Sequence, residues 1–193
     1  MRSSKRDIYG KFGQFLYFQY ENTPWKASKY LGEMAATQVR LFFPGFMKHH
    51  SFHYRLGYLY QDRSNGDSTY VFRSPIFWTR GYSYRIFDEY INQSFNYTFP
   101  IMYPDLHIGP FLNIQRIYAN VFYDHGTRYI HYDPEINQTK QRDYYRSAGV
   151  EVSFDFNLMR FLSLFNMGVR YIYAFDDPGQ PHQWQLLLGD FGF

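Results

Sequence analysis

The chain has 193 residues, of which 21 are Tyr, 21 are Phe and 3 are Trp, so that aromatic residues make up 23% of it. Its formal net charge is +3 and its basic residues are scattered rather than clustered, which argues against nucleic acid as a partner. The lack of Cys excludes disulfides and thiolate metal sites. A mean hydropathy of −0.51, without a run of about 18 apolar residues, excludes a transmembrane helix.

Eight segments of the chain alternate apolar and polar residues, which is the pattern of a strand whose side chains point to opposite faces. They span residues 10–20, 33–43, 49–61, 89–99, 113–124, 145–158, 164–175 and 183–193. Most have about 10–13 residues, near the length that a tilted strand needs to cross a bilayer. The clearest example is SAGVEVSFDFNL at 147–158, where every second residue is apolar and the polar set includes Glu151 and Asp155.

The connections between these segments differ in length according to the end of the sheet. The long ones, 62–88 and 125–144, fall at one end of an up-and-down sheet, and 125–144 is predicted to be a solvated outer loop rich in turn formers. The short turns, 44–48 and 159–163, fall at the other end, where 100–112 is unusually long. This segregation is typical of outer-membrane barrels, which have short periplasmic turns and long outer loops.

A transmembrane β-barrel reconciles a polar average composition with apolar strand faces, because lipid-facing and lumen-facing residues alternate along each strand. A soluble β-sandwich has the same composition but no reason to segregate its loops. We therefore expect a single all-β domain over 1–193, an antiparallel up-and-down transmembrane β-barrel of the bacterial outer membrane. Its eight strands close alone or form half of a barrel of about sixteen strands, and Glu151 and Asp155 face the lumen.

The N-terminal stretch MRSSKRDIYGKFGQF begins with basic residues but lacks the apolar run of about 7–15 residues that a signal peptide needs. An outer-membrane protein has to be exported from the cytoplasm. The sequence is therefore expected to be a mature form or the later part of a longer chain.

The longest connection contains the tripeptide Arg80-Gly81-Tyr82 within FWTRGYSY, and five of the predicted strands follow it. In this position the tripeptide resembles a motif of the BamA-type family of assembly factors and translocases, also called the bacterial surface antigen family. In that family an Arg-Gly-aromatic motif at the tip of a long outer loop folds back into the lumen. RSAGVEVSFDFN at 146–157 is similar to the third-from-last strand of the family, with its Ser-x-Gly-x pattern. The resemblance covers 62–193, and covers the earlier residues by strand count only.

The resemblance implies that Arg80 enters the lumen and loses water, so that it needs a carboxylate partner. Glu151 and Asp155 face the same lumen and are the candidates, while Gly81 allows a tight or left-handed backbone at the loop tip. The sequence departs from the family in three ways. It has no POTRA-like repeats, it contains half of the strands expected of the barrel, and Thr79 stands where the family has a hydrophobic residue before the Arg.

The predicted last strand ends in Phe191 and Phe193, which resemble the C-terminal signal by which outer-membrane barrels are recognised for assembly. Aromatic girdle residues at a membrane interface have the same pattern. Residues 99–126 are in addition similar to barrels of Bacteroidota outer-membrane proteins. Both resemblances imply that the chain is the C-terminal half of something larger.

Two groups of residues resemble part of a metal site or of a catalytic site, but each lacks other residues that such a site needs. In KHHSFH at 48–53, His49 and His53 share a strand face and His50 points away, whereas zinc needs three or four ligands. Asp124 and His125, at the outer end of the fifth segment, come with no nucleophile signature such as G-x-S-x-G. We expect no metal, no cofactor and no enzymatic activity.

The function expected from the resemblance is insertion or translocation of proteins at the outer membrane, with Arg80 locking the loop and a weak seam between the first and last strands. The expected partners are outer-membrane lipid and lipopolysaccharide, the barrel assembly machinery, and client outer-membrane proteins or lipoproteins. The alternative is a non-catalytic barrel that serves as a membrane anchor or as a ligand-binding or structural protein. A weak seam predicts poor pairing of the last strand, whereas an anchor predicts full pairing.

Overall fold

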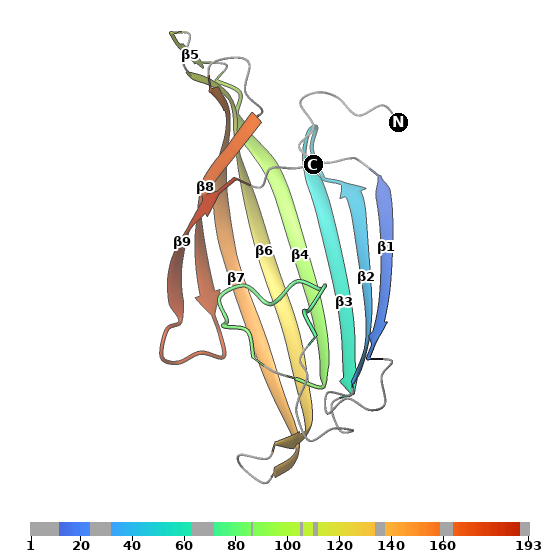
Figure 1. The fold of residues 1–193 in the computed structure, drawn as a ribbon. Helices are drawn as coiled ribbons and strands as arrows, with labels where there is room; N and C mark the ends of the chain where they lie inside the picture. The colour runs from blue at the N-terminus through green and yellow to red at the C-terminus, as the bar shows by residue number, and fades with distance from the viewer. Residues whose placement is uncertain are drawn as a thin grey trace.

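The computed structural model describes residues 12–23, 32–62, 72–85, 87–104, 106–109, 112–133, 138–158 and 164–189. Within these ranges the chain forms nine strands and no helix (Figure 1). The strands are β1 (Gly13–Asn22), β2 (Glu33–Pro44), β3 (Ser51–Asp62), β4 (Glu89–Met102), β5 (Leu106–Ile108), β6 (Leu112–Asp133), β7 (Gln138–Leu158), β8 (Leu164–Ala174) and β9 (His182–Leu188). No helix among the described residues is long and apolar enough to cross a membrane.

All strand pairs among the described residues are antiparallel, and the sheet runs in the order β1-β2-β3-β4-β6-β7-β8-β9, with β5 paired to β6. The prediction of an all-β, antiparallel, up-and-down architecture is therefore confirmed. Each of the eight predicted strands is present, since the period-2 alternation that marks them is strong enough to fix their positions. The connection that looked too long for a turn, 100–112, contains the short hairpin of β5 and the start of β6.

The prediction of a loop over 125–144 is wrong for most of that range. Strands β6 and β7 continue through it and pair with each other from Asp124↔Ser147 to Asp133↔Gln138. Gly126 and the polar residues around it are typical of turns when they are considered alone. Here each has a partner across the ladder, so the two longest strands form a hairpin that extends beyond the rest of the sheet (Figure 1).

The sheet is curved and has two chemically different faces. Since residues in register share a face, the apolar sets of neighbouring strands align on the outer, convex side. Exposed apolar side chains on this side include Leu16, Phe18, Phe43, Tyr58, Phe95, Val121, Val150, Phe154, Met167, Val169, Trp184, Leu186 and Leu188. Buried polar side chains on the concave side include Gln38, Ser51, Asn92, Ser94, Asn96, Thr98, Asn120, Asp124, Ser147, Ser153 and Asp155. The outer face of the sheet is thus largely apolar, while the inner face carries most of the buried polar side chains.

The sheet is not closed within the described residues. Strands β1 and β9 each have one partner strand, β2 and β8, and no pairing joins β1 to β9. Of the fold prediction, the architecture and direction of the strands are therefore borne out, while closure of the eight strands on themselves is absent from this part of the chain.

The connection between β3 and β4 returns across the concave face. Residues 72–85 rise from the end of the sheet where β3 stops and lie along its inner side (Figure 1). The packing there is apolar, and a buried cluster joins this segment to four strands. It consists of Met34, Ala36, Leu59, Phe72, Ile76, Phe87, Tyr90 and Tyr145, with Trp78 and Tyr82 against it. This cluster fixes the segment on the sheet and so positions the tripeptide that follows Thr79.

Candidate functional site: a loop arginine on the concave face

Arg80 projects from the 72–85 segment onto the concave face and forms ion pairs with two carboxylates. Its Nε and Nη2 donate to Oδ2 and Oδ1 of Asp124 at 2.7 Å each, and its backbone N–H donates to Oδ2 at 3.2 Å. Its Nη1 donates to Glu151 Oε1 at 2.9 Å. The Arg80 side chain is 12% exposed and that of Asp124 is 1% exposed, so the pair is largely removed from water.

The guanidinium of Arg80 has further polar and aromatic neighbours. Nη2 donates to Ser94 Oγ at 3.0 Å and to Asn96 Oδ1 at 2.9 Å, and the guanidinium lies 3.5 Å from the centroid of the Phe122 ring. Burial alone would lower the pKa of Arg80. The hydrogen bond and charge of Asp124, together with Glu151, outweigh burial and hold the pKa of the guanidinium above its usual range.

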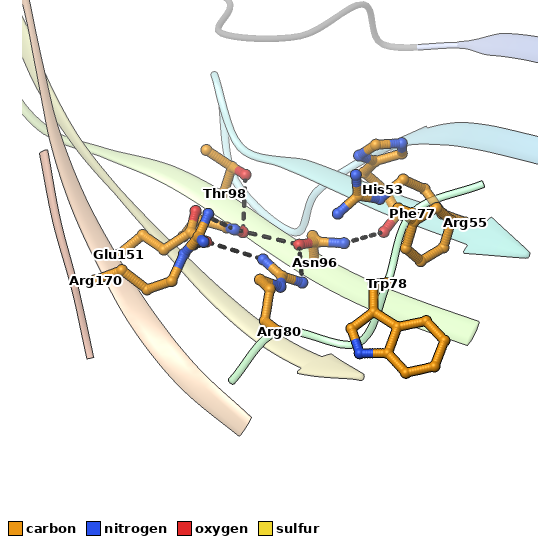
Figure 2. Close-up of a pocket in the computed structure, with 10 residues that line it drawn as sticks. His53, Arg55, Phe77, Trp78, Arg80, Asn96, Thr98, Glu151 and Arg170 are labelled. Carbon is orange, nitrogen blue, oxygen red and sulfur yellow. Dashed lines mark hydrogen bonds and ion pairs between the residues drawn. The ribbon is translucent and has the colours of Figure 1, made fainter. Parts of the chain in front are cut away.

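The strands supply these partners through their alternation. Alternate residues of β4, β6, β7 and β8 face the concave side, and they form a continuous polar network around the arginine (Figure 2). Asn120 receives a hydrogen bond from Thr98 and donates to Glu151 at 3.0 Å. Arg170 on β8 donates to the same carboxylate at 2.6 Å. Glu151 is therefore shared by arginines from the loop and from the sheet.

Gly81 sits at a point where no other residue fits without strain. Its φ is +87°, in the left-handed region that glycine enters freely, and a Cβ built there would lie 2.8 Å from Ile172 Cγ2. Its carbonyl accepts a hydrogen bond of 2.7 Å from Gln183 Nε2 on β9. The glycine thus lets the loop backbone approach β8 and β9 closely.

Tyr82 connects the loop to the turn between β8 and β9. Its hydroxyl donates to the carbonyl of Arg146 at 2.7 Å and accepts from the backbone N–H of Asp176 at 2.9 Å. The Arg146 side chain pairs with the Asp176 carboxylate at 2.7 Å. Burial raises the pKa of the Tyr82 hydroxyl, which remains protonated and able to donate.

Thr79 takes the place of the hydrophobic residue that the resemblance would put before the arginine. It is buried, its backbone N–H donates to the Tyr90 hydroxyl at 3.1 Å, and its Oγ1 lies 2.7 Å from the same oxygen. The polar side chain is accommodated because a buried tyrosine supplies its partner. Gly126 on β6 makes room for both, since a Cβ there would lie 2.6 Å from the Tyr90 hydroxyl.

Among the residues predicted to form the site, Arg80, Gly81, Tyr82 and Glu151 come together on the concave face. Asp155 is not part of this group. It lies four residues along β7, roughly 13 Å further at the rise of a strand, and forms an ion pair with Arg116. Phe191 and Phe193 lie outside the described residues.

Sequence reasoning missed Asp124, which makes more hydrogen bonds to Arg80 than Glu151 does. The residue was considered only as a rim carboxylate beside His125. The alternation of side chains along the strand could have identified it. Phe122 and Asp124 are two residues apart on β6, so they face the same side, which is also the side of the polar β4 residues with which they pair.

The structure separates the residues of both alternative sites. Asp124 faces the concave side and His125 the outer side of β6, because they are adjacent on one strand. His50 Nδ1 lies 2.9 Å from the Tyr97 hydroxyl, and His53 stacks on Phe42 at 4.3 Å. In the part of the chain that the structure describes, no group of three or more His, Cys, Asp or Glu side chains is arranged to hold a metal ion.

A pocket of about 280 Å³ opens beside Arg80 on the concave face. It is lined by His53, Arg55, Phe77, Trp78, Arg80, Asn96, Thr98, Asn120, Glu151 and Arg170, which come from the 72–85 segment and from strands β3, β4, β6, β7 and β8 (Figure 2). Its wall carries three arginines and one carboxylate.

Comparisons with protein-family models, with curated proteins and with solved structures find no match to this chain. The fold and the site therefore define its class by architecture alone: an antiparallel, curved all-β sheet whose concave polar face holds a buried loop arginine.

Proposed function

We propose that this chain spans the bacterial outer membrane as part of a transmembrane β-barrel. The support is the distribution of polarity over the two faces of the sheet. On the outer side Phe18 is 67% exposed and Trp184 is 73% exposed, while Asn92 and Ser94 on the inner side are fully buried. A soluble sandwich buries its apolar faces against each other, whereas a membrane barrel turns its apolar face to lipid.

The position of the 72–85 segment favours a barrel of more than eight strands. The interior of an eight-stranded barrel is only wide enough for its own side chains. Here the concave face also holds a folded-back segment with Phe77 and Trp78 against the sheet. We infer that further strands pair with the free edges of β1 and β9, in a barrel of about sixteen strands.

Within that barrel we propose a role in the insertion or translocation of proteins at the outer membrane. The observation that carries the proposal is the buried ion pair of Arg80 with Asp124 and Glu151. It fastens a loop inside the lumen, where the loop contacts strands on both sides of β6. A loop fastened inside the lumen keeps a wide barrel in one shape, and the insertion or translocation of proteins requires a lumen whose shape is controlled.

The experiment compares wild-type protein with Arg80→Ala in lipid vesicles, measuring the rate at which an unfolded outer-membrane protein becomes protease-protected. Arg142→Ala is the control, because Arg142 is an exposed arginine on the β6–β7 hairpin that stacks on Tyr129 and Tyr144. We expect at least a tenfold lower rate for Arg80→Ala and no change for the control. Equal rates in all three proteins would overturn the proposed role, as would no protection by the wild type.

A second candidate, a non-catalytic membrane anchor or ligand-binding barrel, is favoured by one observation. All seven residues of β9 pair with β8, from Met167↔Leu188 to Tyr173↔His182. A weak last strand was the expectation for a translocase. If the chain is an anchor, Arg80→Ala lowers its stability, but wild type and variant both leave the assembly of the client protein at the rate seen without either of them.

The membrane assignment has a separate test, which the absence of native Cys makes simple. Spin labels are attached to single-cysteine variants of reconstituted protein, at Val169→Cys and Leu186→Cys on the outer side and at Gln185→Cys on the inner side. We expect oxygen, which partitions into lipid, to relax the outer labels more, and a water-soluble nickel complex to relax the inner one more. The same accessibility at all three positions would contradict the barrel.

A further inference from the structure

The two edge strands of the sheet are staggered along their length. A line that runs perpendicular to the strands, from each residue to its paired neighbour, starts at Gly13 on β1 and ends at Gln183 on β9. It passes through Phe42, His53, Asn96, Phe122, Gly149 and Ile172. Gly13 begins β1, whereas Gln183 is near the start of β9, at the opposite end of the sheet (Figure 1). The strands are therefore tilted, as the strands of a barrel are.

The two edges need partner strands if the sheet lies in a bilayer. Each edge strand presents a row of backbone N–H and C=O groups, and an unsatisfied group in lipid costs several kcal/mol. Among the described residues β1 pairs only with β2, and β9 only with β8. Strand direction alternates along the eight-strand path, so β1 and β9 run in opposite directions. The β9 of one copy is thus an antiparallel partner for the β1 of a second copy in the same membrane orientation.

The outer sides of the two edges match in one register of this kind. When Gln183 is set opposite Glu21, the end of β1 lies beside the start of β9, and the other pairs follow from the antiparallel order. The outer pairs are then Tyr20 with Trp184, Phe18 with Leu186, and Leu16 with Leu188, and each of these side chains is more than half exposed in the single chain. Aromatic and aliphatic pairs directly opposite each other stabilise a sheet.

The same register brings polar residues together on the inner side. The inner pairs are Glu21 with Gln183, Gln19 with Gln185, and Tyr17 with Leu187. Gln19 donates to Glu21 within β1, and Gln185 accepts a hydrogen bond of 3.1 Å from Arg170 on β8. The polar network of the concave face therefore continues across the junction, and no two like charges lie directly opposite each other. Matching inner and outer faces are what specify the register of a strand pair.

This register also gives the strands the tilt of a membrane barrel. The perpendicular line that starts at Gly13 would continue from Gln183 to Glu21 of the next copy, eight residues further along β1. Two copies would thus accumulate a stagger of sixteen residues around sixteen strands. With a rise of about 3.3 Å per residue and about 4.8 Å between strands, the strands tilt by about 35°, which agrees with the tilt of about 35–45° in outer-membrane barrels.

One copy closed on itself would use the same register but would have too narrow a lumen. The interior of an eight-stranded barrel is filled by its own side chains, whereas here the 72–85 segment also lies on the concave face, with Trp78 against the buried cluster. Barrel diameter grows roughly linearly with strand number, so sixteen strands enclose about four times the cross-section. That lumen has room for two such segments.

We propose that two copies of this chain join edge to edge, β1 of each with β9 of the other, in one sixteen-stranded barrel around a two-fold axis. The proposal rests on the membrane barrel proposed above and names a second copy as the source of its further strands. Each junction joins residues 182–188 of one copy to residues 16–22 of the other. The two identical junctions close the ring, so no edge remains to which a third copy could add.

Cysteine cross-linking tests the junction, since the chain has no native Cys. Two differently tagged preparations of the full chain, Gln19→Cys and Gln185→Cys, are refolded together in detergent and oxidised. Phe18→Cys with Leu186→Cys is the second pair, because either the inner or the outer pairs occupy the non-hydrogen-bonded positions, where side chains are closest. We expect at least one pair to give a disulfide-linked product that carries both tags, at about twice the 23.4 kDa of one chain.

Phe15→Cys is the matched control for Gln19→Cys. It lies on the same face of β1 but four residues away, roughly 13 Å along the strand. Its disulfide yield with Gln185→Cys should be at least tenfold lower than that of Gln19→Cys. Light scattering of the wild type in detergent should give a protein mass of two copies. A monomeric mass, no product from either pair, or an equal yield from the control would each overturn the proposal.

A chain that carries both Gln19→Cys and Gln185→Cys distinguishes the two ways of closing the sheet. A disulfide within a monomer would mean that eight strands close alone, which also overturns the proposal. The oxygen and nickel accessibility of the spin labels is an independent measurement. A chain that shows lipid on its outer side but fails to cross-link would span the membrane without a second copy, so failure of this proposal is distinguishable from failure of the membrane assignment.

Discussion

Asp124 receives three hydrogen bonds from Arg80, two from the guanidinium at 2.7 Å each and one from the backbone N–H at 3.2 Å. The carboxylate is on β6 and the arginine is in the segment that returns across the sheet, so this contact spans 44 residues of sequence. Both groups are almost fully removed from water. Each charge is therefore tolerated in the interior only because the other is present.

The first prediction follows from that dependence. Asp124→Ala leaves Arg80 buried with Glu151 as its remaining carboxylate, and we expect the free energy of unfolding to fall by about 3–5 kcal/mol. Arg80→Lys should lose a similar amount, because a lysine cannot reproduce the two-pronged contact. Urea unfolding of the refolded chain measures both. The control is Asp176→Ala, which breaks a more exposed ion pair with Arg146. If it lowers the free energy of unfolding as much as Asp124→Ala does, the buried ion pair of Asp124 is not the more important of the two.

The second prediction concerns the backbone at the loop tip. Gly81→Ala forces a side chain onto a residue with a φ of +87° and brings its Cβ to 2.8 Å from Ile172 Cγ2. We expect a loss of about 2–4 kcal/mol from conformational strain and overlap together.

A double-mutant cycle with Ile172→Ala separates the two causes. The shorter side chain removes the overlap but not the strain, so Gly81→Ala should cost about 1–2 kcal/mol in that background. The same cost in both backgrounds would mean that Ile172 does not limit the loop, and a cost near zero in the second would mean that strain is unimportant.

Much of the fold was predictable because it depends on a local signal. The period-2 alternation in β3, β4, β7 and β8 marks strands whose two faces meet different environments, and a shift of one residue would exchange those faces. The same parity places Glu151 on the inner side, where Arg80 contacts it. These conclusions need no knowledge of what lies across the sheet.

The rest depends on contacts between distant segments. Residues 125–133 have the composition of a loop, but Tyr129 pairs with Arg142 and Gly126 with Tyr145, and these ladders extend the strands. Strand preference is set largely by such neighbours, which a single segment does not reveal. Gly126 lies in the range predicted to be a loop, whereas in the structure it is a strand residue that leaves room for Thr79 and Tyr90. Asp124 was missed for the same reason, since its partner comes from another part of the chain.

The third prediction tests the link between the loop and the β8–β9 turn. Tyr82→Phe removes the hydroxyl that donates to the Arg146 carbonyl and accepts from the Asp176 N–H. We expect a loss of about 1 kcal/mol and faster amide hydrogen exchange at Asp176, with little change in the amides of β4. Tyr171→Phe, which removes a hydroxyl on the outer side near His182, is the matched control. Unchanged exchange at Asp176 would show that Tyr82 is not what holds the turn.

The fourth prediction concerns pH and the same turn. The hydrogen bond from Arg146 is the main cause that holds the pKa of Asp176 below its ordinary value of 3.8, while partial burial works in the opposite direction. A carboxyl group with a depressed pKa stabilises the folded state above its ordinary pKa, and that contribution is lost as the pH falls through the depressed value. The protection of the Arg146 amide, which donates to Asp176 Oδ2 at 2.8 Å, should therefore be constant from pH 7 to about 5 and decrease below about pH 4.

Asp176→Asn is the control for this pH effect, because an amide side chain does not titrate in that range. Its Arg146 amide should be less protected than that of the wild type at pH 6, and the two proteins should converge as the wild-type carboxylate becomes protonated. Hydrogen exchange of the two proteins from pH 3 to 6, corrected for the intrinsic rate, measures the difference. A difference in protection between the two proteins that stays constant down to pH 3 would mean that the charge of Asp176 does not stabilise this turn. The hydrogen bond from the Asp176 backbone N–H to the Tyr82 hydroxyl would then be what stabilises it.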